Sequence, residues 1–441
     1  TDRHQTTSHK STMATLLDPL ELPCGATLPN RLAKGAMTEG LATPDGEPTP
    51  QLNRLYGLWS DGGAGMLLSG NIQIDRDHLE RPGNVILQGG KVESEATMEA
   101  YKEWTKAATR NQNHFWAQIS HAGRQVQKDV NPSPKAPSTV KVGLPGGKFG
   151  QPVPLTVAEI EDIVESFGNA AKTCQNAGFT GVQIHAAHGY LLSSFLNPLV
   201  NQRTDDYGGS LENRARILLA VVKNMRQKVG PKFPISVKLN SADFQKGGFR
   251  FEDSLQVVQW LEKATVDLIE ISGGNYEQAA MMNLPGLEAR EEQEVNKAPS
   301  TKAREAYFLD FAKAMQEVVK VPLMVTGGFR TKAAMEYALE SGGADLIGLG
   351  RPLCVMTDGP KQLMAGTIES LPRYEDNLDM IPDWLGCLKR IQIFKMVNSV
   401  APIMWFYEQL ESLGQTGTTI SDLGTFKALL AVEARNQRLL A

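Results

Sequence analysis

Eight short apolar segments recur along this chain, and stretches with helical periodicity separate most of them. Most of the segments are apolar throughout rather than alternating, which is typical of strands buried on both faces of a parallel sheet. The segments are residues 31–37, 65–70, 114–120, 181–185, 234–240, 267–272, 322–327 and 345–350. Eight strands that alternate with helices predict a (β/α)8 TIM barrel, in which catalytic groups lie at the carboxyl ends of the strands.

The predicted helices carry local signals for where helices begin and end. The helix over 156–178 opens with Thr156 and Glu159, a capping-box pair, and ends at Gly178. The other predicted helices are 97–112, 212–230, 252–264, 302–319 and 329–344. The helix between the first two strands is poorly defined by the sequence.

Composition narrows the functional class. The net charge is −4, which gives no electrostatic case for binding nucleic acid or a membrane surface. No apolar span is long enough to cross a bilayer. The four cysteines lie far apart and form no CxxC pair, which argues against an iron–sulfur cluster and favours a reducing, cytoplasmic location.

The chain divides into three predicted parts. Residues 1–12 are polar and lack the apolar core of a secretory signal, so we interpret them as a disordered leader or an expression remnant. Residues 13–370 form the barrel. Residues 371–441 predict an apolar helical extension that packs on the barrel or against a second subunit in a homodimer. Two long connections, 121–155 and 273–301, are predicted lids or binding loops.

Chemistry-bearing residues gather where the fourth predicted strand ends, in the run HAAHGY at 185–190. Histidine can donate, accept or take up a proton near neutral pH, and a neutral phenol can give up a proton. We therefore predict that His185 and His188 hold a carbonyl oxygen and that Tyr190 protonates the neighbouring carbon. A zinc site on the two histidines is the alternative, but no third ligand lies at a familiar spacing, so no metal is predicted.

Two glycine-rich turns follow the last two predicted strands. TGGF at 326–329 follows the seventh strand and opens the next helix, and GLGR at 348–351 follows the eighth. Glycines let backbone N–H groups approach a phosphate, and barrels often bind phosphate after strands seven and eight. The predicted phosphate site consists of Gly327, Gly328, Gly350 and Arg351. A surface salt bridge is the alternative for the guanidinium.

These motifs resemble the old yellow enzyme family of FMN-dependent ene-reductases. The strongest likeness is HAAHGYLLSSFLNPLVNQRTDDYGGSLENRARIL at 185–218, supported by QISHAGRQ at 118–125. The likeness runs through most of the chain, from residue 19 to residue 353. It implies FMN as the cofactor, NAD(P)H as the hydride donor, and an NAD(P)H-dependent flavin oxidoreductase that binds a small electron-poor alkene.

The resemblance also implies the flavin contacts Ala36, Met37, Thr38, Asn71, Gln118, His185 and Lys238. Thr38 would tune the potential of the flavin, and Gln118 would bond to its pyrimidine edge. Lys238 would lie near flavin N1, where a cation stabilises the negative charge that collects on reduction. The family more often has Arg there; Lys keeps the charge but loses the bidentate fork.

The mechanism implied by the resemblance is a ping-pong cycle. NAD(P)H delivers hydride to flavin N5, and an α,β-unsaturated carbonyl or nitro compound then takes the place of the nicotinamide. His185 and His188 polarise its oxygen, N5 passes hydride to the β-carbon, and Tyr190 protonates the α-carbon. The alternatives are an iron–sulfur dienoyl-CoA reductase, a redox-silent aldolase or isomerase using Lys238, and a non-catalytic flavin-binding barrel.

Overall fold

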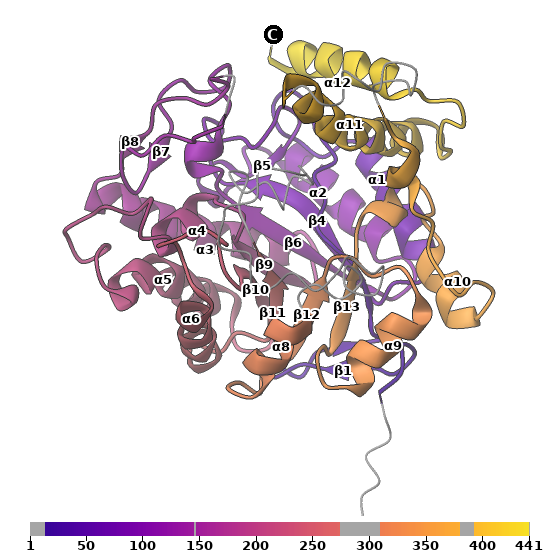
Figure 1. Cartoon of the computed structure of the whole chain (residues 1–441), viewed down its shortest axis with the longest axis horizontal. Coiled ribbons are helices and arrows are strands. Elements are labelled where there is room, and N and C mark those ends of the chain that lie inside the picture. Colours follow the sequence, from indigo (N-terminus) through magenta and orange to yellow (C-terminus); the bar gives the residue numbers. More distant parts are fainter. Residues whose placement is uncertain (1–13, 145–146, 274–308, 380–391, 441) are drawn as a thin grey trace, which may run out of the picture.

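Eight parallel strands close into a barrel, in an order that follows the sequence (Figure 1). The structure is a computed structural model that describes residues 14–144, 147–273, 309–379 and 392–440. The barrel strands are β3 (Leu32–Lys34), β4 (Met66–Gln73), β6 (His114–Ser120), β9 (Gly181–Ala186), β10 (Ile235–Asn240), β11 (Leu268–Ser272), β12 (Leu323–Thr326) and β13 (Leu346–Leu349). The last strand pairs with the first, so the sheet has no open edge there. The predicted strands and the predicted barrel are confirmed.

Helices cover the outside of the barrel. They are α1 (Pro50–Asp61), α2 (Glu95–Ala108), α3 (Val157–Asn176), α4 (Leu191–Leu196), α5 (Leu211–Val229), α6 (Phe251–Lys263), α8 (Leu309–Gln316), α9 (Lys332–Glu340) and α10 (Gly359–Ala365). The predicted capping box of α3 is present. α1, which the sequence defined poorly, has Thr49 as its N-cap and Pro50 in its first turn, where a missing N–H costs nothing. Part of the sequence prediction lies outside the described residues: the predicted loop 273–301 except residue 273, the first part of the predicted helix 302–319, and Cys387.

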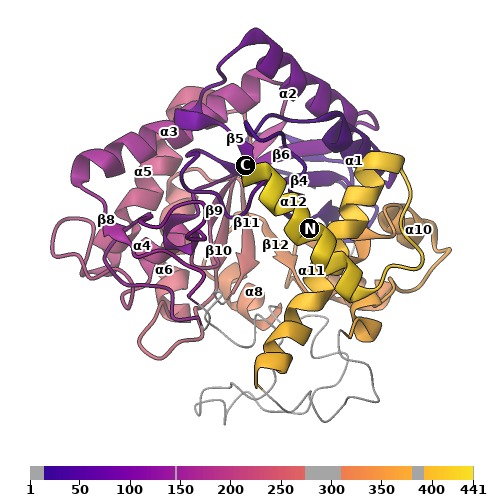
Figure 2. The same ribbon diagram turned by 90° about the horizontal axis from the view of Figure 1, so that it is seen from above.

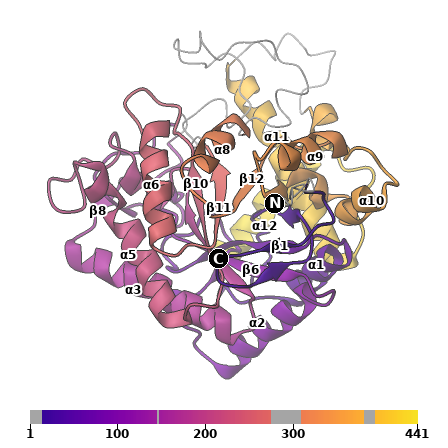
Figure 3. The same cartoon turned by 90° about the horizontal axis from the view of Figure 1, so that it is seen from below.

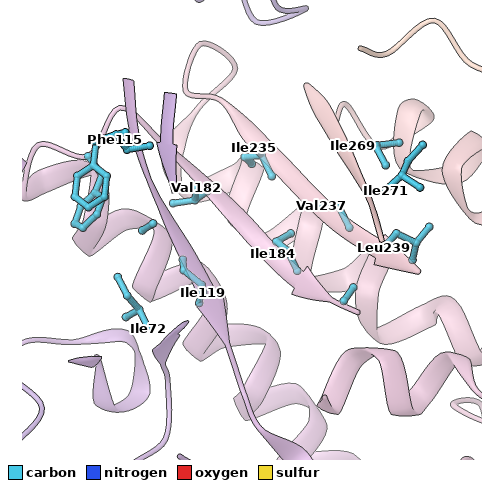
Figure 4. Packing of buried hydrophobic residues seen from close by; sticks show 14 of the residues in the cluster. Ile72, Phe115, Ile119, Val182, Ile184, Ile235, Val237, Leu239, Ile269 and Ile271 are labelled. Atoms are coloured by element: carbon cyan, nitrogen blue, oxygen red, sulfur yellow. The ribbon is translucent and has the colours of Figure 1, made fainter. Parts of the chain in front are cut away.

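Side chains alternate between the barrel interior and the layer beneath the helices. Figure 4 shows outward side chains such as Ile119, Ile184 and Val237, which belong to a large buried apolar cluster. The lower interior is filled by a smaller apolar cluster, whose members on the barrel strands are Ala33, Met66, Leu68, Trp116, Leu268, Met324 and Leu346. The hairpin of β1 (Leu20–Glu21) and β2 (Thr27–Leu28) closes this end of the barrel (Figure 3). Among the described barrel strands, the inward positions at this lower end are thus apolar.

Two helices follow the barrel, α11 (Gln392–Thr416) and α12 (Thr425–Leu440), and they lie at the end where the strands finish (Figures 1 and 2). Arg81, in the loop after β4, connects them to the barrel. Its guanidinium carbon lies 3.8 Å from the centre of the Tyr407 ring, and its Nη2 donates to Asn436 Oδ1 at 3.2 Å. None of the helices within the described residues is long and apolar enough to span a bilayer.

Candidate active site

Polar side chains replace apolar ones toward the carboxyl ends of the barrel strands. The inward positions there hold Gln118, Ser120, Gln183, His185, Lys238, Asn240, Glu270 and Ser272, all of them buried. Asn71 joins this set because β4 is irregular. Leu68 pairs with Trp116 and Asn71 pairs with Gln118, so β4 has one extra residue that turns Asn71 inward.

His185 and His188 lie within hydrogen-bond distance of each other. His185 Nε2 is 3.1 Å from His188 Nδ1, while His185 Nδ1 is 2.8 Å from Asn71 Oδ1. His188 Nε2 is 2.6 Å from Ser272 Oγ. Burial lowers the pKa of both imidazoles well below the ordinary value, and the charge of Lys238 acts in the same direction. Both rings are therefore neutral near pH 7, and each carries a single N–H.

Glu80 determines which ring nitrogens carry those hydrogens. Asn71 Nδ2 donates to Glu80 Oε2 at 3.2 Å, so Asn71 presents its oxygen to His185. An oxygen acceptor at that position requires N–H at His185 Nδ1 and leaves a lone pair at Nε2. His188 then donates its Nδ1–H to His185 and accepts the Ser272 hydroxyl. The pair thus offers one donor and one acceptor to a ligand that separates the two rings.

The backbone of His188 is held in an unusual conformation. Its φ is +64°, a region that histidine rarely adopts. Asn240 Oδ1 accepts from His188 N at 3.2 Å, and Gln125 Nε2 donates to His188 O at 2.9 Å. The sequence analysis missed both of these supporting residues, although Gln125 ends the QISHAGRQ block. Their hydrogen bonds fix where the His188 ring can lie.

Tyr190 completes the trio predicted from the sequence. Its ring centre lies 4.7 Å from that of His185 in an edge-to-face arrangement, and the residue is 2% exposed. The phenol packs against Ala122 and Val126 from the loop after β6. Tyr190 stands directly before α4, which fixes its backbone. The structure therefore brings His185, His188 and Tyr190 together at one end of the barrel, while their catalytic roles stay predictions.

The depressed histidine pKa values make folding stability depend on pH. An unfolded histidine titrates near pH 6.5, whereas His185 and His188 resist protonation when folded, so the unfolded state binds more protons below about pH 6.5. We expect the free energy of unfolding to fall by about 1 kcal/mol per pH unit for each histidine below that pH. Urea unfolding of the apoprotein near pH 7 and near pH 5 measures this loss. His188→Gln should show a smaller loss, and an equal loss in the variant would contradict the assignment.

Gln118 and Lys238, which the resemblance assigns to the flavin ring, both lie in the barrel interior. Gln118 Nε2 donates to Gln183 Oε1 at 2.7 Å. Lys238 Nζ is 3.0 Å from Glu270 Oε1, and both side chains are buried. The sequence analysis identified neither Gln183 nor Glu270, because a polar residue inside an apolar strand does not reveal which strand it faces.

The loop after β3 carries three further residues that the resemblance assigns to the flavin. Ala36 packs against the apolar cluster of the lower interior. Met37 Sδ lies 3.5 Å from Cys354 Sγ. Thr38 Oγ1 donates to Glu80 Oε2 at 2.5 Å. Because Glu80 also bonds Asn71, the hydroxyl of Thr38 is connected to the histidine pair through one carboxylate.

The two glycine turns lie side by side, because β12 and β13 pair directly. Gly327 has φ of 135° and Gly328 has φ of 80°, which other residues rarely adopt. Gly350 begins the turn after β13. The prediction that TGGF itself opens a helix is wrong by a few residues, because Thr331 is the N-cap and α9 begins at Lys332. Backbone N–H groups of the turns, rather than the helix end alone, are therefore the candidate phosphate donors.

Arg351 shares a carboxylate with a second arginine. Arg351 Nη1 is 3.3 Å from Glu375 Oε1, and Arg330 Nη2 is 2.6 Å from the same atom. The Arg351 side chain is 45% exposed whereas that of Arg330 is 7% exposed. Arg351 is thus the guanidinium with room to turn toward a ligand. Arg330 was missed from the sequence, because nothing in its neighbourhood distinguishes it from a surface arginine.

These residues fit FMN. Gln118 and Lys238 offer polar contacts for the ring edge, and the glycine turns with Arg351 offer N–H groups and charge for the phosphate. Thr326 Oγ1, directly before Gly327, is buried and has no hydrogen-bond partner among the described residues. Buried polar atoms are nearly always satisfied, so this hydroxyl indicates a ligand group nearby.

A second histidine cluster lies outside this site and is unsuited to a metal. Asp75 Oδ2 is 2.7 Å from His78 Nδ1 and 3.7 Å from His121 Nε2. The opposite ring nitrogens accept backbone hydrogens, from Lys135 N at 2.7 Å and from Gly123 N at 3.0 Å. Both neutral rings must therefore carry hydrogen on the nitrogen that faces Asp75, which leaves no lone pair for a metal ion. The cluster instead joins the loops after β4 and β6.

Comparison with known proteins adds independent findings. A family model described as the NADH:flavin oxidoreductase / NADH oxidase family matches residues 15–367. The chain is 36% identical over 375 residues to the NADH-dependent flavin oxidoreductase iliE of Neonectria sp. (strain DH2), covering 81% of this chain and 48% of that protein. It is 33% identical over 368 residues to iliE of Hypocrea jecorina (strain QM6a), covering 78% of this chain and 88% of that protein. The chain thus spans about half the length of the first relative and most of the second.

The fold also matches a solved structure. An old yellow enzyme homologue from Zymomonas mobilis superimposes with a TM-score of 0.65 at 25% identity. The match covers 84% of this chain and 98% of that one. The solved fold therefore covers most of this chain.

Proposed function

This chain belongs to the NADH:flavin oxidoreductase / NADH oxidase family, of the old yellow enzyme type, and on that premise we propose that it reduces electron-poor alkenes with NAD(P)H. The substrates are α,β-unsaturated carbonyl or nitro compounds. Bound FMN supplies the redox chemistry, by accepting a hydride from the nicotinamide and passing it to the alkene. The observation that carries the proposal is a pair of neutral imidazoles beside a buried phenol. His185 Nε2 lies 3.1 Å from His188 Nδ1, and the ring centre of Tyr190 lies 4.7 Å from that of His185.

The histidine pair holds the substrate oxygen. An oxygen that enters between the rings replaces the hydrogen bond from His188 to His185 and accepts the Nδ1–H of His188. The ring of His185, held by Asn71, lies on the other side of that oxygen. The donor on His188 stabilises the negative charge that develops on the oxygen, as in an oxyanion hole.

Tyr190 delivers the proton. A phenol O–H can give its hydrogen to a carbon that becomes basic during the reaction. Packing against Ala122 and Val126 fixes the ring beside His185, which supports the role of this phenol as the proton donor. The three side chains therefore have different roles: His185 and His188 bind the substrate oxygen, and Tyr190 protonates the carbon.

Product analysis tests the proposal. The protein is loaded with FMN and supplied anaerobically with NADPH or NADH and 2-cyclohexen-1-one. We expect cyclohexanone in an amount equal to the nicotinamide oxidised. Oxidation of the nicotinamide by oxygen alone, with the enone recovered intact under anaerobic conditions, would contradict it.

The homodimer and the cytoplasmic location stay predictions from the sequence.

Arg351→Ala is expected to weaken FMN binding by about ten- to a hundred-fold. A hydrogen bond to a charged group contributes about 1.5–3 kcal/mol, and Arg351 is the exposed guanidinium beside the glycine turns. Quenching of flavin fluorescence by the apoprotein measures the dissociation constant. Arg110→Ala is the matched control, because Arg110 is 47% exposed and pairs with Asp61 away from the turns. Unchanged affinity in Arg351→Ala would remove it from the phosphate site.

A further inference from the structure

A row of buried polar side chains crosses the barrel interior from β6 to β11. Its members are Gln118, Gln183, Lys238 and Glu270, with exposures of 2%, 0%, 6% and 0%. Burying polar groups costs free energy unless they are paired, so a row this deep implies a constraint on each member. Two of the four, Gln118 and Lys238, are the residues assigned above to the flavin ring.

We propose that Glu270 is a positioning residue that orients Gln118 and sets the reduction potential of the flavin, an inference that rests on the proposed function. Glu270 receives contacts from both directions along the row. Gln183 Nε2 donates to Glu270 Oε2 at 2.8 Å, and Lys238 Nζ lies 3.0 Å from Glu270 Oε1. The fully buried carboxylate of Glu270 therefore connects the two glutamine amides, Gln118 and Gln183, to the ammonium group of Lys238.

The orientation follows from hydrogen-bond chemistry. An ionised carboxylate can only accept, so Gln183 must turn its Nε2 toward Glu270. Its second Nε2 hydrogen goes to Ser236 Oγ at 3.0 Å, and its oxygen is left for Gln118, whose Nε2 donates to it at 2.7 Å. Gln118 is thereby left with its oxygen and one N–H for a ligand. This combination of acceptor and donor matches a pyrimidine edge, which carries an N–H beside a carbonyl oxygen.

The charge of Glu270 acts on Lys238, its neighbour in the row. Reduction places negative charge at flavin N1 and O2, which the Lys238 ammonium stabilises. A carboxylate 3.0 Å from that ammonium offsets part of its effect and makes reduction less favourable. Within the described residues Glu270 Oε1 has no hydrogen-bond partner, so the Lys238 contact is an ion pair without hydrogen-bond alignment. The hydrogens of Lys238 therefore need not be directed at Glu270.

The test is the midpoint potential of the FMN-loaded protein, measured anaerobically against a reference dye. Glu270→Gln removes the charge with little change in volume. We expect the ratio of reduced to oxidised flavin at a fixed dye potential to rise by about tenfold, which is about 30 mV for a two-electron couple. Glu270→Asp keeps the charge and should stay near the wild-type potential. An unchanged or more negative potential in Glu270→Gln overturns the proposal.

Two further variants complete the design. Glu262→Gln is the matched control, because Glu262 Oε1 accepts from Val321 N at 2.9 Å outside the row, and its potential should not move. Gln183→Leu keeps the charge of Glu270 but breaks the connection to Gln118. It should weaken FMN binding by about tenfold, the loss of roughly one hydrogen bond to the ring. Unchanged affinity overturns the orienting role, and this measurement decides the matter if Glu270→Gln does not fold.

The readouts separate this inference from the proposed function, because neither requires alkene turnover. A protein that binds FMN and shows the shifted potential, yet leaves alkenes intact, would refute only the proposed function. A protein that reduces alkenes while Glu270→Gln keeps the wild-type potential would refute only the role of Glu270.

Discussion

Replacing Tyr190 with Phe will slow alkene reduction by about 10²- to 10⁴-fold, the usual contribution of a positioned general acid, and will leave flavin reduction by NAD(P)H nearly unchanged. The variant loses one oxygen atom, and the ring keeps its contacts with Ala122 and Val126. Only the step that needs a proton on carbon should therefore respond. Rapid-mixing measurements of the two half-reactions, each followed through flavin absorbance, give the two rates separately.

The control for this prediction is Tyr337→Phe, because Tyr337 lies on α9 and is 58% exposed. That variant should leave both rates unchanged. If Tyr190→Phe slowed flavin reduction as much as alkene reduction, the phenol would be a structural or cofactor-binding group rather than a proton donor.

Replacing His188 with Ala will lower kcat/KM for an enone by about 10²- to 10³-fold, the effect of removing one donor from an oxyanion site. It will also abolish the long-wavelength band that a bound phenolate gives with oxidised flavin, because the phenolate oxygen needs the same donor. Titration with a phenol, followed by absorbance, measures the band directly and needs no turnover.

His188→Asn separates chemistry from backbone strain. Asparagine tolerates the positive φ of this position and still offers an N–H, so this variant should retain a measurable band. His114→Ala, at the opposite end of the barrel, should behave like the wild type, because its ring bonds Thr27 O in the lower hairpin at 3.1 Å and Trp116 Nε1 at 3.4 Å. An undiminished band in His188→Ala would remove His188 from the oxygen-binding site.

The barrel could be predicted because its strands are buried on both faces, which leaves near-continuous apolar runs in the sequence. That His185, His188 and Tyr190 lie together could be predicted for a related reason, since HAAHGY directly follows such a run and all the barrel strands finish at the same end of the barrel. α1 was harder to recognise. Its start depends on the Thr49 side chain, which accepts from Leu52 N, and not on a strong apolar period.

The rest of the site depends on pairing that sequence periodicity does not contain. Asn71 turns inward only because β4 carries an extra residue between Leu68 and Asn71. Glu80 accepts from Thr38, 42 residues earlier in the sequence, and connects it through Asn71 to the histidine pair. In the sequence, Glu270 is a single polar residue inside an apolar strand. Only the closed sheet shows that its carboxylate accepts a hydrogen bond from Gln183. Long-range partners of this kind decide which tautomer and which amide orientation the site presents.

The central claim is that FMN lies at the mouth of the barrel beside His185, His188 and Tyr190, and passes hydride from NAD(P)H to an alkene. One anaerobic absorbance titration of the FMN-loaded protein tests it most directly. The account predicts that NAD(P)H bleaches the flavin band and that one equivalent of 2-cyclohexen-1-one restores it. A protein that retains no FMN after dialysis, or a bleached flavin that the enone does not reoxidise, would contradict the account.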